Sequence, residues 1–228
     1  MLKWTDPPRI REPAVVPGEG RVTGVEPDPR RAGALRVYVD GKVRWTVGRT
    51  EGEADAEALR VGTILTDRQV AAFERAADVE AAYRTALRHL ERRAFATRDL
   101  HRRLVRKGHP AEAVREALET LAAQRLLDDA GFARDYVETR AVRGRGPARV
   151  KRDLLAMGVE GNVIDRAIAE AWPASVPPEE LARALAAKRL KQLGALPRQA
   201  LRRRLVQYLG RRGFGGSVAG KVVREVLG

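Results

Sequence analysis

The sequence contains no cysteine, so disulfide bonds and thiol catalysis are excluded and a reducing compartment is the natural location. It also lacks any run of 18 consecutive apolar residues, and its first residues, MLKWTDPPRIREP, include no apolar signal segment. We therefore expect a cytoplasmic protein that has no membrane partner.

Residues that carry catalysis or bind metals are also scarce. The three histidines, His89, His101 and His109, have neither i,i+4 spacing nor cysteine partners, so no zinc site is expected. No phosphate-binding loop of the GxxxxGKS/T type occurs. Ser217 has no paired histidine and aspartate and is better explained as the N-cap of the last helix. We therefore predict that the protein is not an enzyme and binds no metal or cofactor.

Basic residues outnumber acidic ones, with 44 Lys and Arg against 30 Asp and Glu, for a net charge of +14. Residues 1–66 hold 11 basic and 10 acidic residues, so nearly all of the excess lies in residues 67–228. Such a surface attracts nucleic acid or an acidic protein, through counterion release and long-range steering. The alternative is the solvated, arginine-rich surface of a protein from a GC-rich or thermophilic source.

The N-terminal part is predicted to be a mobile arm followed by a small β element. Residues 1–20 contain four prolines and little periodicity. The β-hairpin segment is predicted to be residues 21–66: apolar and polar residues alternate over roughly 21–48, and Asp40-Gly41 separates two alternating runs. Because both residues tolerate positive φ, this pattern is typical of a β-hairpin. Trp45 is expected to be a core residue of this segment rather than a platform for base stacking.

From residue 67 onward the sequence repeats. Thr97, Pro147 and Pro197 stand fifty residues apart, each at the predicted start of a basic helix, and Gly108 and Gly158 end the first two of these helices. Each repeat contains three segments with apolar residues at three- and four-residue spacing, which predicts three helices. The predicted three-helix repeats are residues 67–127, 128–173 and 174–228.

The pattern predicts a mainly α protein with tandem three-helix repeats in an elongated, curved array and a small N-terminal β-hairpin element. A fifty-residue bundle buries only a marginal core, so neighbouring repeats are expected to pack in series. The third basic helix ends only at Gly213 and should be about one turn longer than the others.

The middle repeat has the clearest local signals. Asp128 and Asp129 are expected to begin a helix, because a short carboxylate accepts the free N–H groups of a first turn. A catalytic carboxylate pair is the less favoured alternative, since adjacent side chains diverge on a helix. Pro147 suits the first position of the next helix, which should end at Gly158.

The second helix of every repeat is basic. Residues 84–107 carry nine basic residues and two acids, and residues 183–212 carry ten basic residues and no acid. Between residues 134 and 152 there are seven basic residues and two acids. Any single arginine is most simply a solvated side chain, but a basic helix that recurs with the repeat indicates a binding surface. Arginine also suits bidentate contacts to carboxylate or phosphate.

Two segments of the middle repeat, residues 127–140 and 146–154, resemble the signature of the RecX family. Leu127 to Arg140 is similar to the family pattern LDDxxFAxx(Y/F)(V/I)xxR, and Gly146 to Leu154 is similar to GPx(R/K)(I/V)xx(E/D)L. Met157-Gly-Val follows, with methionine where the family usually has a basic residue. Similar segments also occur before the middle repeat, in Val22-Thr-Gly-Val-Glu-Pro, Val37-Tyr-Val-Asp-Gly, Leu59-Arg-Val-Gly-Thr-Ile-Leu and Ala86-Leu-Arg-His-Leu-Glu-Arg-Arg.

The resemblance implies three-helix repeats and a regulatory role. RecX proteins bind the RecA recombinase, lie in the groove of its filament on DNA, and suppress its ATPase, strand-exchange and coprotease activities. The implied partners are the RecA filament and, more weakly, single- and double-stranded DNA, and we expect a monomer. The alternative is a stand-alone basic helical DNA-binding protein, since triple helices with a basic second helix resemble helix-turn-helix units. Basic helices spread over three repeats favour the regulator.

The predicted contact residues are basic side chains of the three second helices, and of the helix end and turn that precede the middle one. We expect them to make charge-assisted contacts with acidic recombinase loops or with phosphates. Reversing Arg149 and Lys151 to glutamate is expected to weaken inhibition without changing the helical content. Phe132, Tyr136 and Leu154 are predicted to be core residues instead. The predicted contact set is Arg140, Arg143, Arg145, Arg149, Lys151, Arg98, Arg102, Arg103, Arg202, Arg203 and Arg204.

Overall fold

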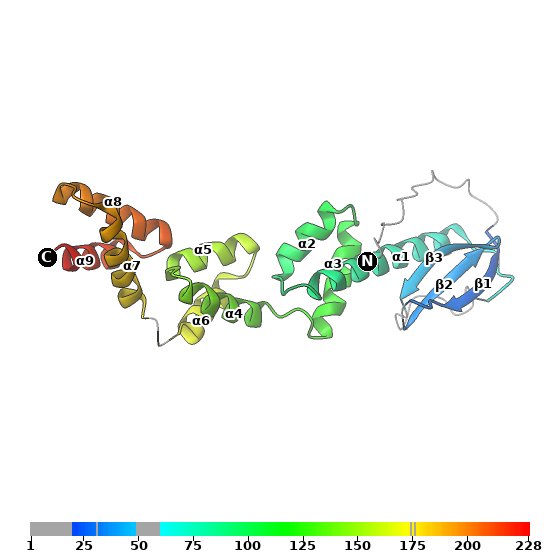
Figure 1. Ribbon diagram of the computed structural model, residues 1–228. Helices are drawn as coiled ribbons and strands as arrows, with labels where there is room; N and C mark the ends of the chain where they lie inside the picture. The colour runs from blue at the N-terminus through cyan, green and yellow to red at the C-terminus, as the bar shows by residue number, and fades with distance from the viewer. Residues whose placement is uncertain (1–19, 31, 49–59, 174, 176) are drawn as a thin grey trace. The chain divides into compact units, whose positions relative to one another are not determined.

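The computed structural model describes residues 20–30, 32–48, 60–173, 175 and 177–228 (Figure 1). They fall into two compact units, Met1–Glu80 and Ala81–Gly228, and the boundary lies inside helix α1 (Asp67–Leu90). The arm predicted from the sequence lies outside the described residues, apart from Gly20. No helix in the described ranges is both long and apolar enough to cross a membrane.

The first unit contains a three-stranded antiparallel sheet in the order β1-β2-β3. Its strands are β1 (Val22–Pro27), β2 (Ala34–Val39) and β3 (Lys42–Gly48). Asp40 and Gly41 join β2 to β3 with positive φ values of 51° and 79°, as a two-residue hairpin turn requires. The predicted hairpin is therefore confirmed, and β1 extends it to three strands by pairing with β2.

One face of the sheet packs against the first turns of α1 (Figure 1). The rings of Trp45 and Phe73 stack with their centroids 5.2 Å apart, and Trp45 is only 6% exposed. Val22, Val37 and Leu65 belong to the same cluster. Trp45 is thus a core residue, as the alternating pattern predicted.

The described part of the chain contains nine helices, which confirms a mainly α protein built from three-helix repeats. Each repeat forms a small bundle of three helices (Figure 1), and α8 is longer, at 15 residues, than α2 and α5, at 10 and 11. The helices after α1 are α2 (Thr97–Arg106), α3 (Ala111–Ala123), α4 (Asp129–Val142), α5 (Pro147–Met157), α6 (Gly161–Ala171), α7 (Pro178–Leu193), α8 (Arg198–Arg212) and α9 (Gly216–Leu227).

Each repeat has its own core, made of apolar residues three or four positions apart on each helix. In the second repeat, Val150 and Leu154 of α5 are fully buried in one cluster with Ile164 of α6. Phe132 and Tyr136 pack at the edge of this cluster and are only partly buried. The first and third repeats bury equivalent residues of their second helices: Leu100, Leu104, Leu205 and Leu209.

The ends of these helices follow the local signals with one exception. The Asp128 carboxylate accepts the N–H groups of Ala130 and Gly131, at 3.0 and 2.9 Å, and caps α4 as predicted. Gly158 ends α5 in the left-handed conformation, with a φ of 90°. The prediction for Ser217 was wrong: Gly215 is the N-cap of α9, and Ser217 lies inside the first turn.

The second helix of each of the first two repeats begins against atoms of the following repeat. The N–H of Thr97 in α2 donates to Asp129 Oδ1 at 2.8 Å, and the Thr97 hydroxyl donates to the same oxygen at 2.9 Å. The N–H of Gly146, the N-cap of α5, donates to the carbonyl of Arg212 at 2.7 Å. Because the first N–H groups of a helix have no partner within it, these bonds stabilise the helix starts and join neighbouring repeats.

Replacing Asp129 by alanine is therefore expected to destabilise α2, although Asp129 belongs to α4. The change removes both acceptor contacts to Thr97, and loss of a capping carboxylate costs about 1–2 kcal/mol. Amide hydrogen exchange should show faster exchange at Thr97 and through the first turn of α2. Asp128→Ala is the matched control, since that carboxylate caps α4 instead. Equal loss of protection in α2 from both variants would contradict the assignment.

Candidate partner-binding surface

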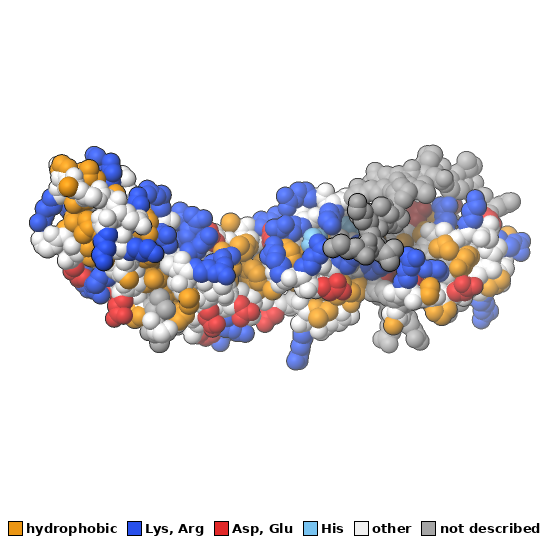
Figure 2. Space-filling model, viewed as in Figure 1, with side chains coloured by type: hydrophobic (Ala, Val, Ile, Leu, Met, Phe, Trp, Pro, Cys, Tyr) orange, Lys and Arg blue, Asp and Glu red, His pale blue; other side chains and the backbone are white. Residues whose placement is uncertain are grey.

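The predicted contact residues lie on α2, at the end of α4, on the turn between α4 and α5, on α5 and on α8. They differ in how far acidic neighbours compensate their charges. Lys and Arg side chains outnumber acidic ones over the third repeat, at the left of Figure 2. An arginine that makes an ion pair with a nearby carboxylate attracts an external anion less strongly than an arginine without such a neighbour. The ion pairs within each repeat therefore decide which of these residues can act in binding.

In the middle repeat, three of the predicted residues are held by acids of the same repeat. Arg149 Nε donates to Asp153 Oδ1 at 2.8 Å, and Arg145 makes an ion pair with the other oxygen of Asp153. Lys151 pairs with Asp165 of α6. Reversing Arg149 and Lys151 would place like charges beside both acids, so this change perturbs the fold as well as any partner contact.

The two remaining predicted residues of the middle repeat differ from each other. The guanidinium of Arg140 lies over the Tyr136 ring, 4.8 Å from its centroid, and the Arg140 Nε is buried without a hydrogen-bond partner among the described residues. Arg143 is exposed and makes no ion pair within the described part of the chain. Only Arg143 of this group presents an uncompensated charge at the surface.

In the first repeat, the predicted residues of α2 mainly support the structure. Arg103 Nε donates to Asp99 Oδ2 at 2.9 Å. Arg102 donates to the carbonyl of Ala156 in the second repeat at 2.8 Å, which adds a further link between the two repeats. Arg98 lies 4.0 Å from a carboxylate oxygen of Glu160, and the side chains of this pair are exposed, so the pair contributes little stability.

His89, at the end of α1, lies close to several basic side chains of α1 and α2 and of the residues that follow them. Burial lowers the pKa of His89, and the charges of Lys107, Arg103, Arg92 and Arg88 lower it further. Both causes act in the same direction, because burial disfavours the charged imidazolium and protonation would add another cation to this group. The lowered pKa favours the neutral imidazole of His89, so the positive charge near α2 comes from the arginines and the lysine.

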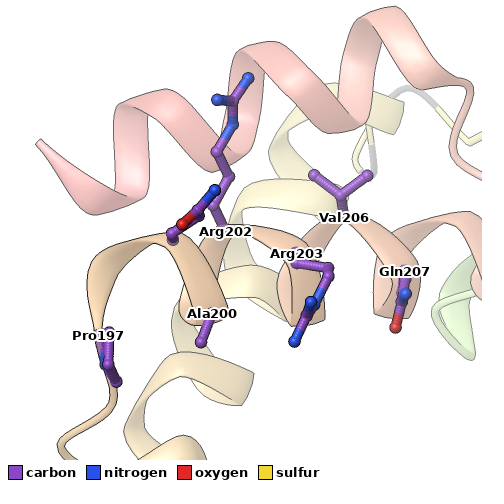
Figure 3. Close-up of a pocket in the computed structure, with 7 residues that line it drawn as sticks. Pro197, Ala200, Arg202, Arg203, Val206 and Gln207 are labelled. Carbon is purple, nitrogen blue, oxygen red and sulfur yellow. The ribbon is translucent and has the colours of Figure 1, made fainter.

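The arginines of α8 are the freest of the predicted set. Arg202, Arg203 and Arg204 are exposed, and no acidic side chain pairs with them in the described part of the chain. Arg202 and Arg203 line a hollow of about 540 Å³ on α8, where their side chains leave the helix in different directions (Figure 3). The residues that line this hollow are Pro197, Gln199, Ala200, Arg202, Arg203, Val206 and Gln207.

A second hollow, which we call the interrepeat groove, brings the predicted residue Arg143 together with residues that were not in the predicted contact set. It has a volume of about 570 Å³ and lies between the turn after α4 and helices α7 and α8. Its basic residues belong to the acid-free run 183–212, apart from Arg143, so the charge run was the available signal. The residues lining the groove are Val142, Arg143, Gly144, Leu181, Leu185, Lys188, Arg189, Gln192, Tyr208 and Arg212.

These surfaces are suited to bind anions. Exposed guanidinium groups bind carboxylate or phosphate in a bidentate manner, and repetition along the chain adds avidity to individually weak contacts. Among the described residues, no group of three or more His, Asp or Glu side chains could hold a metal ion. The surface arrangement thus supports binding to an acidic partner or to phosphates.

Models of the RecX three-helix domains match the chain in order. The first matches residues 82–121, the second residues 128–168 and the third residues 178–223. Together they span more than half of the 228 residues, and each match lies within one repeat of the structure. The repeat defined by sequence and structure is therefore the domain that these models describe.

Similar proteins carry the same description. The regulatory protein RecX of Halorhodospira halophila is 38% identical over 147 residues, which are 62% of this chain and 85% of that protein. The regulatory protein RecX of Limosilactobacillus reuteri is 30% identical over 199 residues, which are 87% of this chain and 74% of that protein.

Two crystal structures have a similar fold. A structure of regulatory protein RecX has a TM-score of 0.72 at 27% identity and covers 91% of this chain and 100% of its own. RecX from Lactobacillus salivarius has a TM-score of 0.57 at 20% identity, covering 65% of this chain and 96% of its own, and this likeness concerns the fold alone.

Proposed function

Because the chain belongs to the RecX family of regulatory proteins, we propose that it regulates the RecA recombinase without catalysing a reaction of its own. In this proposal the protein binds the RecA filament on DNA and inhibits its ATPase, strand-exchange and coprotease activities. The filament offers the same binding sites repeatedly, so three linked repeats can engage several subunits at once. Such linkage raises overall affinity without any single strong contact.

The observation that carries the proposal is the exposed basic surface of α8, which belongs to the acid-free run 183–212 of the third repeat and is joined along the chain to two further three-helix repeats. Arg202, Arg203 and Arg204 are exposed and without an acidic partner in the described part of the chain. Many of the basic side chains of α2 and α5 instead make contacts inside the protein. We therefore propose α8 as the main contact helix and the predicted residues of α2 and α5 as secondary contacts.

The second candidate function is binding of DNA in the absence of the recombinase. It is favoured by the position of the three exposed arginines on the second helix of a three-helix bundle, the arrangement of helix-turn-helix proteins. Phosphate contacts of this kind give a binding constant that falls steeply with salt. The regulator and the DNA-binding protein therefore differ in whether the activity requires RecA.

Adding the protein to RecA on single-stranded DNA is expected to lower ATP hydrolysis at near-stoichiometric or substoichiometric ratios. The titration should be run at two salt concentrations, together with a binding measurement to RecA filaments and another to DNA alone. Unchanged hydrolysis, with binding to the filament verified, would refute the proposal. Tight duplex binding with a steep salt slope and no effect on RecA would favour the second candidate.

A further inference from the structure

We propose that the interrepeat groove binds an acidic peptide segment that carries an aliphatic or aromatic side chain. This inference rests on the proposed function only in taking the partner to be a protein. The groove is a different site from the exposed arginines of α8, because it is formed by the second and third repeats together. The ligand we assign to it is an acidic peptide. The groove contributes four basic side chains, and none of the residues that line it is acidic.

The positions of two of these basic groups are fixed by neutral partners. Arg212 Nη1 donates to the carbonyl of Gly144 at 3.3 Å, and Arg189 Nη1 donates to Gln192 Oε1 at 3.0 Å. Neither partner cancels the positive charge. The guanidinium groups are therefore held in place before a ligand binds, which reduces the entropy lost on binding.

The same two guanidinium groups lie near one aromatic ring. The Cζ atoms of Arg212 and Arg189 are 5.1 and 5.7 Å from the centroid of the Tyr208 ring. Cation–π contacts of this kind orient the arginines further. They also occupy the surroundings of the ring, so Tyr208 is a poor platform for stacking a nucleic-acid base.

The other two basic residues are free to reach a ligand. Arg143 and Lys188 are both exposed, and neither makes an ion pair in the part of the chain that the structure describes. Arg143 precedes Gly144, whose φ of 77° turns the chain beside Arg212. Carboxylates of a bound segment could thus contact basic groups from both repeats.

The apolar residues of the groove favour an acidic peptide over a nucleic acid as its ligand. Val142 is 68% exposed, and Leu181 and Leu185 of α7 are partly buried against the core of the third repeat. An apolar side chain of a peptide would bury this surface, as the central residue of a protein interface does. A phosphodiester backbone would use the charges and leave the apolar surface exposed to water.

The inference can be tested on the full chain by fluorescence anisotropy with three labelled probes. The first is a 12-residue peptide of Asp and Glu with a central Leu-Phe pair, and the second has Ser in place of that pair. The third is a single-stranded oligothymidylate of matched charge. We expect the first probe to bind at least about tenfold more tightly than the second, because only it fills the apolar part.

Two variants locate the binding. Arg143→Glu combined with Lys188→Glu is expected to weaken binding of the first probe at least about tenfold, since two attractive charges become repulsive. The control, Arg134→Glu combined with Arg224→Glu, makes the same change in net charge at exposed residues outside the groove and should change affinity less than about twofold. Circular dichroism should show equal helical content in both.

Three results would overturn the inference: equal binding of the two peptides, equal loss in both variants, or oligothymidylate binding that is the tightest of the three and is lost with the groove variant. Inhibition of RecA by the wild-type protein, measured in parallel, separates this inference from the proposed function. Inhibition without groove-dependent peptide binding overturns the groove assignment alone. Groove-dependent peptide binding without inhibition overturns the proposed function and leaves the groove as a site for another acidic protein.

Discussion

Reversing Arg202, Arg203 and Arg204 together to glutamate is expected to abolish most of the inhibition of RecA. These three side chains are exposed on α8 and have no acidic neighbour among the described residues, so their full charge acts on a partner. The protein concentration needed for half-inhibition of ATP hydrolysis should rise at least about tenfold. The three side chains are exposed and glutamate is a good helix former, so α8 should still form.

The matched control reverses three exposed basic residues that belong to none of the proposed contacts, Arg134, Lys191 and Arg224. It changes the net charge equally, so an equal loss of inhibition would mean that only the overall charge matters. DNA binding, measured in the absence of RecA, adds a second reading. If the three arginines contact phosphates, the logarithmic salt slope should fall by about three in the α8 variant.

Replacing Gly213 by alanine is expected to undock the third repeat from α5. Gly213 has a φ of 91°, which L side chains rarely adopt, and its α carbon faces Arg149 so closely that an added Cβ would overlap the backbone of Arg149. The carbonyl of Gly213 also accepts the N–H of Ala148 at 3.2 Å, and Arg212 accepts that of Gly146 at 2.7 Å. The combined strain and lost bonds should destabilise this contact by about 2–4 kcal/mol.

Amide exchange at Gly146 and Ala148 and the thermal midpoint would measure this effect. Gly210→Ala is the matched control in the same helix, since an added Cβ there meets nothing within 4 Å. That change should leave the contact intact and stabilise α8 by about 0.5–1 kcal/mol, because alanine favours the helix. Similar amide protection in the two variants would show that the close approach at Gly213 does not join the repeats.

The agreement between sequence and structure is best where a feature depends on neighbours along the chain. The cap at Asp128, the hairpin turn at Asp40-Gly41 and the end of α5 at Gly158 all followed from single residues and their immediate context. The error at Ser217 has the same origin, because Gly215 can also begin a helix and local preference separates the two positions by little.

From the sequence, the candidate contact residues could be identified only as a group of basic side chains. Counting charges identified the basic second helices, but it could not distinguish Arg149, which shares Asp153 with Arg145, from Arg203, which has no acidic partner in the described part of the chain. Arg102 was predicted as a contact for a partner, yet it donates to Ala156, which lies 54 positions away. Such pairings arise between helices and leave no periodic signal.

The sequence by itself determined the three-helix repeat, the hairpin, most helix ends and the excess of positive charge, because each depends on residue type and spacing along the chain. Only the tertiary structure decided which cations remain free, that Asp129 caps the preceding repeat, and that Arg143, Lys188 and Arg212 line one groove. The reason is physical: an ion pair or a groove needs side chains within a few ångströms of each other, and that proximity is created by packing between helices.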